Sequence, residues 1–210
     1  VVDVRLTNGH NELIIANRNG RAVRFDENTI RTMGRTSTGV RGMRLDEGDD
    51  AVIGMIVVND AENENVMVVS EKGYGKRSEV MDYRVTNRGG KGVKTINVTD
   101  KTGRLVAIKN VTDENDLMII NQSGIVIRLA VADCRVMGRA TQGVRLINLS
   151  KKNDVIASVC KVMSSELEAS VEEDSRAAWA KKSEEIEEET KAVNPEKAED
   201  EASADSTIEE

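Results

Sequence analysis

One sequence pattern occurs three times in this chain, at nearly constant spacing. Its copies span residues 33–41, 86–94 and 137–145, and each holds a basic residue, a glycine and a second basic residue at matching positions. The matching glycines, Gly39, Gly92 and Gly143, are separated by 53 and 51 residues. A period of this size is typical of repeat architectures. We therefore expect three similar structural units followed by a tail.

Each unit is expected to consist of four short β-strands. Apolar runs rich in β-branched residues alternate with polar turns, and Asn19-Gly20 is a strong hairpin signal because both positions tolerate positive φ. The predicted strands are 2–6, 13–17, 22–25 and 40–45, then 52–58, 66–70, 76–80 and 93–98, then 105–111, 117–121, 125–129 and 144–149, and finally 155–162.

The strand predicted at the start of each unit occurs four times, at 2–6, 52–58, 105–111 and 155–162. Each of the other three predicted strands of the unit occurs three times. That offset arises if one strand of each unit joins the neighbouring sheet. We therefore predict an all-β, propeller-like array of four-stranded blades with strands shared between neighbours, with repeats at about 1–51, 52–104 and 105–162. Three blades alone would leave exposed edges, so the pattern indicates a partial set from a larger array.

The charge of the chain is divided between two parts. Residues 1–161 hold 25 of the 30 Lys and Arg residues and 20 of the 37 Asp and Glu residues, a formal charge of +5, whereas residues 162–210 carry −12. A basic body favours a polyanionic partner, and the acidic segment 163–210 is either a competitor for the same surface or a solubility segment. Within it we predict a weak helix over about 165–193, ended by Pro195, and then disorder.

The sequence contains no recognisable catalytic or metal-binding constellation. His10 is the only histidine, no Cys-x-x-Cys occurs, and neither Gly75-Lys76 nor Gly90-Lys91 is followed by Ser or Thr as a P-loop requires. No signal peptide and no run of about 18 apolar residues is seen, so we expect a cytoplasmic protein without a membrane partner. We expect no catalytic residue, cofactor or metal in this chain.

The repeated loops are suited to binding phosphate. Arginine offers a forked donor, and glycine allows close backbone approach. The alternative is that these cations only protect strand edges, but their threefold recurrence favours binding. The expected cations are Arg35, Arg41, Arg88, Lys91, Lys94, Arg139 and Arg145, and the expected backbone contacts are at Gly39, Gly89, Gly90, Gly92 and Gly143.

The expected nucleic acid is duplex DNA. Single-stranded and sequence-specific RNA recognition relies on aromatic stacking, and the body offers only Phe25, Tyr74 and Tyr83. The scarcity of aromatic side chains favours binding to the phosphate backbone of a duplex, with few contacts to its bases.

These motifs, together with Tyr74-Gly75-Lys76-Arg77, resemble the last three blades of the C-terminal domain of the DNA gyrase A protein, over residues 1 to about 162. The resemblance implies a β-pinwheel, a propeller-like disc that wraps duplex DNA around a basic rim, and it adds Lys76 and Arg77 to the DNA-binding set. It implies partnership with the gyrase A catalytic core and the gyrase B subunit in ATP-dependent negative supercoiling. ATP and Mg²⁺ would bind elsewhere in that enzyme, and Tyr74 and Tyr83 would pack between strands.

Two alternatives remain. The hallmark Gln-Arg-Arg-Gly-Gly-Lys-Gly box of the resembled family lies in its first blade, and residues 86–92 are only a look-alike that lacks the Gln and the first Arg. The chain could instead resemble the C-terminal domain of topoisomerase IV, whose blades are fewer and more divergent. It could also be a propeller-like scaffold for protein interactions, which would bind no DNA.

Overall fold

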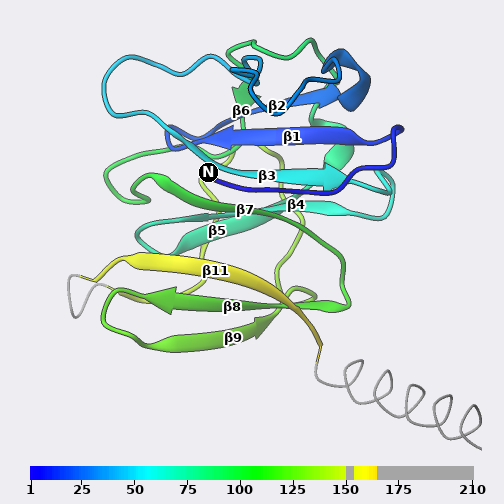
Figure 1. The fold of residues 1–210 in the computed structure, drawn as a ribbon. Helices are drawn as coiled ribbons and strands as arrows, with labels where there is room; N and C mark the ends of the chain where they lie inside the picture. Colours follow the sequence, from blue (N-terminus) through cyan, green and yellow to red (C-terminus); the bar gives the residue numbers. More distant parts are fainter. Residues whose placement is uncertain (150–153, 165–210) are drawn as a thin grey trace, which may run out of the picture. The chain divides into compact units, whose positions relative to one another are not determined.

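The computed structural model describes residues 1–149 and 154–164, and the described part is built from β-strands with two short 3₁₀ turns. The helix predicted over 165–193 and the rest of the acidic tail lie outside the described residues. No described helix is long and apolar enough to span a membrane. Figure 1 shows the strands arranged in three sheets that stack on one another.

The first sheet, sheet A, combines strands from two sequence repeats. Its order is β3-β1-β2-β6, where β1 is Glu12–Asn17, β2 is Arg21–Asp26, β3 is Val52–Val58 and β6 is Val93–Lys94. β1 pairs antiparallel with β2 and with β3, while β6 adds only the pairs Ala22↔Val93 and Arg21↔Lys94. Two of its four strands therefore come from the second repeat.

The same exchange of strands recurs one repeat further along the chain. Sheet B has the order β10-β5-β4-β7, formed by Val144–Arg145, Tyr74–Glu79, Asn65–Ser70 and Leu105–Val111. Sheet C has the order β11-β8-β9, formed by Ile156–Met163, Asn115–Asn121 and Val126–Ala130. The 3₁₀ turns η1 (Glu27–Thr29) and η2 (Val80–Asp82) follow the strands β2 and β5. The predicted all-β array with strands shared between neighbouring blades is confirmed.

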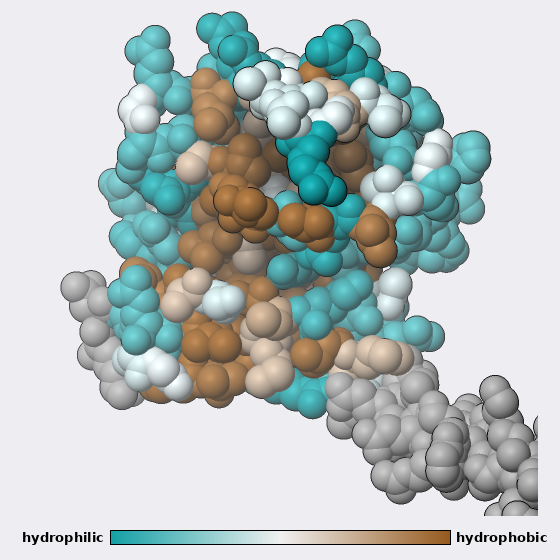
Figure 2. All heavy atoms as spheres, in the orientation of Figure 1, coloured by the Kyte–Doolittle hydropathy of each residue, from teal (hydrophilic) through white to brown (hydrophobic). Residues whose placement is uncertain are grey.

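Two predicted strands, 2–6 and 40–45, do not form. Their counterparts in later repeats pair only with the preceding sheet, and the described residues contain no sheet before sheet A. Val2, Val4 and Leu6 are accordingly 61%, 75% and 96% exposed. Figure 2 shows apolar residues gathered across the middle of the face on which the chain begins. The fourth strand of each later repeat is only two residues long, because the next two backbone N–H groups both donate to one carbonyl, Gly20 O after β6 and Gly73 O after β10.

The core lies between the sheets. Successive side chains of a strand point to opposite faces, and the unbroken apolar run of β4 fills both. Val66 and Val68 join a cluster with Ile14 and Ile56 of sheet A. Met67 and Val69 join a second cluster, together with Leu117, Ile119 and Ile156 of sheet C. Sheet B is therefore buried on both faces and contributes to the apolar cluster on each side of it.

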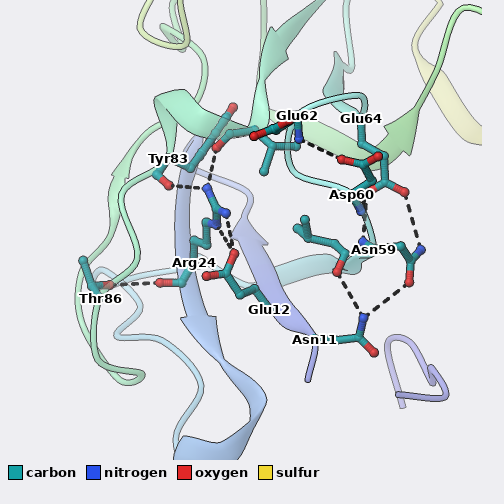
Figure 3. A network of polar contacts seen from close by, with 11 residues as sticks. Asn11, Glu12, Arg24, Asn59, Asp60, Glu62, Glu64, Tyr83 and Thr86 are labelled. Atoms are coloured by element: carbon teal, nitrogen blue, oxygen red, sulfur yellow. Dashed lines mark hydrogen bonds and ion pairs between the residues drawn. The ribbon is translucent and has the colours of Figure 1, made fainter. Parts of the chain in front are cut away.

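A buried arginine also joins sheet A to the following repeat (Figure 3). Arg24 of β2 is 6% exposed, and its Nε donates to Glu12 at 2.7 Å. Its guanidinium also donates to the carbonyls of Val80 and Tyr83, at 2.9 and 3.0 Å. A buried charge is tolerated only when it is paired and hydrogen-bonded, and these contacts meet that requirement while tying η2 to the preceding blade.

Candidate nucleic-acid interface

The repeated loops of successive units lie against one another, because β6 and β10 carry each loop onto the preceding blade. In the first contact, Gly89 N donates to Gly42 O at 2.6 Å, and Arg44 N donates to Gly90 O at 2.8 Å. In the second contact, Asn97 N donates to Thr141 O at 3.1 Å, at the position equivalent to the Arg44–Gly90 bond. The structure therefore brings the three copies of the sequence pattern into one row.

Two of the predicted DNA-binding arginines hold this row together. Arg88 donates to the carbonyls of Thr29 and Arg41, at 3.0 and 3.3 Å. One repeat later, Arg139 donates to the carbonyls of Asp82 and Lys94, at 3.1 and 2.9 Å. The acceptors occupy matching positions in their repeats, so the same pair of hydrogen bonds between neighbouring repeats occurs twice. Both guanidinium groups are partly exposed and already hydrogen-bonded to the preceding repeat.

Arg35 occupies the matching position in the first repeat, and it is exposed. Within residues 1–149 and 154–164 its side chain has no hydrogen-bond or ion-pair partner. The described residues contain no earlier repeat whose carbonyls could accept hydrogen bonds from it. Arg35 is thus free to meet an external anion, in contrast to Arg88 and Arg139.

The pattern glycines divide into two groups. Gly92 and Gly143 have φ of 76° and 81°, and a Cβ on them would lie 2.4 Å from Ala22 O and 2.6 Å from Gly75 O. Glycine is required there by the close approach to the preceding blade. Gly39 and Gly89 also have positive φ, but their Cβ positions meet nothing closer than 3.5 Å. Gly39, Gly89 and the exposed Gly90 therefore keep backbone that is open to a ligand.

The remaining predicted loop cations are exposed, and three of them have polar partners. Lys91 Nζ lies 2.9 Å from Asp46 Oδ1, and its hydrogen bond lowers the pKa of that carboxyl. Lys94 donates to Asn97 at 3.2 Å. Arg145 donates to the Tyr74 hydroxyl at 3.0 Å, which lowers the pKa of that hydroxyl. Arg41 is exposed. Such surface contacts are weak in water, so these side chains can exchange their partners for a phosphate.

Lys76 and Arg77 do not lie on the surface, and this corrects the prediction that they contact DNA. Lys76 is fully buried, and its Nζ donates to Gly138 O at 2.6 Å; burial lowers its pKa to about 8. Arg77 is 8% exposed and pairs with Asp113. Its Nε is buried without a hydrogen-bond partner in the described structure. The sequence shows two adjacent cations, but the strand β5 that carries them is buried on both faces.

A second series of cations was missed in the sequence. Arg31, Arg84 and Arg135 are all exposed and are separated by the same 53 and 51 residues as the pattern glycines. Each lies just before its copy of the repeated loop. The signal was present in the sequence, because these arginines keep the register of the repeat.

The described residues hold no group of three or more His, Cys, Asp or Glu side chains arranged to bind a metal. Tyr74 and Tyr83 are buried, at 6% and 0% exposure, and Tyr83 packs in the apolar cluster that includes Ile14 and Ile56, whereas the Tyr74 ring lies under Lys101 and Arg145. Burial raises the pKa of Tyr83 to about 12. Neither tyrosine is presented to the surface as a nucleophile.

Fold and surface together define a class of protein: a strand-sharing, propeller-like β-domain whose repeats present a row of cationic loops. A family model described as the DNA gyrase C-terminal domain, beta-propeller, matches residues 11–59, 64–112 and 115–160. This chain belongs to that family, which confirms the resemblance seen in the sequence. The first two matched segments contain the three long strands of sheet A and of sheet B, and the third contains β8, β9 and the first five residues of β11.

Known relatives and structures agree with this assignment. The DNA gyrase A protein of Staphylococcus aureus (strain MRSA252) is 44% identical over 162 residues, which are 77% of this chain and 18% of that protein. A crystal structure of the C-terminal domain of DNA topoisomerase IV superposes with a TM-score of 0.72 at 26% identity, covering 82% of this chain and 54% of that chain. A structure of the DNA gyrase A C-terminal domain gives a TM-score of 0.68 at 26% identity, covering 75% of this chain and 52% of that chain.

This chain therefore spans about a fifth of the length of the curated relatives that it matches. The similarity to the two solved structures is nearly equal and does not separate the gyrase from the topoisomerase IV domain.

Proposed function

We propose that residues 1–162 bind duplex DNA through its phosphates, with little sequence preference, as the DNA-wrapping part of a gyrase A protein. The observation that carries this proposal is the contiguous row of repeated loops with exposed cations on each. Exposed cations at a regular step suit a polymer of regularly spaced phosphates. The similarity to the gyrase A protein over 162 residues supports the same function.

In that role the chain would act with the gyrase A catalytic core and the gyrase B subunit in the bacterial cytoplasm. DNA bound along the loop row would present one segment to the catalytic core, and strand passage there would introduce negative supercoils at the expense of ATP. This chain would supply binding and geometry only. ATP and Mg²⁺ would belong to the other parts of the enzyme.

The test is binding of a duplex of about 35 base pairs to the 210-residue chain between 50 and 200 mM salt. If about six cations contact phosphates, the plot of log K against log salt should have a slope near −5. Duplexes of different sequence should bind alike, because phosphate contacts carry no sequence information. Absence of binding at 50 mM salt would contradict the proposal and favour a protein-interaction scaffold.

The C-terminal domain of topoisomerase IV is the second candidate, because its solved structure superposes on this chain about as well as that of the gyrase A domain, with TM-scores of 0.72 and 0.68. We expect wrapping, rather than binding, to separate the two candidates, because the resemblance to gyrase implies a rim that wraps DNA. Relaxed circular DNA incubated with the chain and then treated with topoisomerase I should retain positive writhe if the domain wraps DNA as gyrase does. Duplex binding without a change in linking number would favour the second candidate.

The acidic segment 163–210 is expected to compete with DNA for the cationic loops, because it carries a formal charge of −12 beside a body of +5. Removing it should tighten duplex binding at 50 mM salt by about tenfold and increasingly less at higher salt, because screening weakens the competition. Equal affinities of the shortened and full chains at 50 mM salt would exclude the competition and leave a solubility role.

A further inference from the structure

The arginines of the second series, Arg31, Arg84 and Arg135, lack a partner in every described repeat, whereas among the predicted loop cations only Arg35 and Arg41 of the first repeat lack one. All three are exposed, and within residues 1–149 and 154–164 their side chains form no hydrogen bond, ion pair or ring contact. In contrast, Arg88 and Arg139 are engaged by backbone carbonyls. A side chain with five donors and no partner is available to an external acceptor.

The backbone holds each of these arginines in the same way. Each follows a residue whose N–H closes the preceding turn, and two of these residues, Tyr83 and Cys134, are buried at 0% and 6% exposure. The closing bonds are Ile30 N to Glu27 O at 2.8 Å, Tyr83 N to Val80 O at 3.0 Å and Cys134 N to Val131 O at 2.9 Å. The arginines are thus presented from equivalent, anchored positions.

The segment after the arginine is anchored in the two later repeats. Thr86 N donates to Arg24 O at 2.8 Å, and Met137 N donates to Arg77 O at 2.8 Å. Arg24 and Arg77 are the buried arginines of β2 and β5, so the chain is fixed to a rigid strand just beyond Arg84 and Arg135. The backbone that carries these two arginines is therefore ordered before binding, so only their side chains lose conformational entropy when they meet a ligand.

Two of the arginines face clefts that contain a second cation. Arg84 and Lys91 line a cleft of about 360 Å³ together with the backbone of Gly90. Arg135 and Arg145 line a cleft of about 390 Å³, whose wall also includes Asp133. A guanidinium beside a second cation suits a phosphodiester, since the guanidinium binds two of its oxygens at once.

We infer that Arg31, Arg84 and Arg135 are the recurrent phosphate contacts of this domain, one in each repeat, and that Arg88 and Arg139 are positioning residues that join the loops. This inference rests on the proposed binding of duplex DNA. It places one recurrent DNA contact of each repeat outside the repeated pattern of residues 33–41, 86–94 and 137–145, and it gives Arg88 and Arg139 a mainly structural role.

The experiment compares three variants of the 210-residue chain with the unsubstituted chain, using the duplex of about 35 base pairs. The first variant combines Arg31→Gln, Arg84→Gln and Arg135→Gln. Its salt slope should fall by about 2.7, because each lost contact removes about 0.9 from the slope, and its affinity at 0.1 M salt should fall on the order of a hundredfold. Its thermal midpoint should not change, since the three side chains are exposed and unpaired.

The matched control combines Arg5→Gln, Lys109→Gln and Lys161→Gln, which removes the same charge from another surface. These three cations lie near one another: burial is the main cause that lowers the pKa of Lys161, and the nearby Arg5 and Lys109 lower it further. The control should bind with nearly the original salt slope. Equal slopes for the control and the first variant would overturn the inference, whereas failure of the unsubstituted chain to bind at 50 mM salt would overturn the proposed function itself.

The third variant, Arg88→Gln with Arg139→Gln, tests the positioning role. Loss of four hydrogen bonds between repeats should lower the thermal midpoint by several degrees. The salt slope of the DNA-binding fraction should stay within about one of the original. An unchanged midpoint with a slope reduced by about two would show that these arginines contact phosphate directly, and would overturn the division of roles.

Discussion

Gly143→Ala is expected to lower the free energy of unfolding by about 3 kcal/mol or more. Gly143 has a φ of 81°, and an alanine there costs about 1–2 kcal/mol from backbone strain alone. The new Cβ would also lie 2.6 Å from Gly75 O and 3.0 Å from Gly75 C. Backbone atoms cannot move aside without breaking the pairing of β10 with β5, so the two effects add. Gly92→Ala should behave alike, since its Cβ would meet Ala22 O at 2.4 Å.

The first repeat supplies the control for this prediction. Gly39 occupies the matching position with a φ of 84°, but a Cβ there meets nothing within 4 Å. Gly39→Ala should therefore cost only the backbone strain, about 1–2 kcal/mol. Urea denaturation of the three variants measures the difference. Equal losses for Gly39→Ala and Gly143→Ala would show that β10 does not pack closely on the preceding blade.

The stability of the domain should rise between about pH 8 and pH 10, by up to roughly 3 kcal/mol, through Lys76. Burial lowers its pKa from 10.5 to about 8, an effect that the nearby Asp82 opposes and Arg139 reinforces. Between these two values the unfolded chain binds more protons than the folded chain, so folding becomes more favourable as the pH rises. Above about pH 10 the raised pKa of Tyr83, about 12, acts in the opposite direction.

Lys76→Val tests this assignment, because Val23 occupies the matching position in the first repeat and is also buried. The variant leaves Gly138 O without its donor, at a cost of about 1–3 kcal/mol. Its free energy of unfolding should nevertheless be flat between pH 8 and pH 10. If the increase with pH persists in the variant, a group other than Lys76 is responsible.

Several features of the fold were predictable because they depend on local sequence. The hairpin at Asn19-Gly20 lies where predicted, and β3, β4, β7 and β8 lie within two residues of their predicted bounds. Even the sharing of strands could be inferred, since the long shared strand occurs once more than the others. These features repeat at a fixed step, and a repeat is visible without knowledge of any contact.

The absence of strands at 2–6 and 40–45 could not be predicted from the residues of those segments alone. These segments resemble β3, β7 and β6 in composition, yet they form no strand, because pairing requires a neighbouring sheet that the described residues lack. Strand propensity is realised only when a partner satisfies the backbone N–H and C=O groups.

The sequence by itself determined the repeat, the all-β class, the family and the basic character of the body, because periodicity and composition are properties of the chain alone. Only the tertiary structure decided the role of each cation. It buried Lys76 and Arg77, turned Arg88 and Arg139 toward the carbonyls of the preceding repeat, and left Arg84 exposed beside an open cleft. The physical reason is that the availability of a charged side chain depends on which distant backbone acceptors, carboxylates and strands the fold places around it.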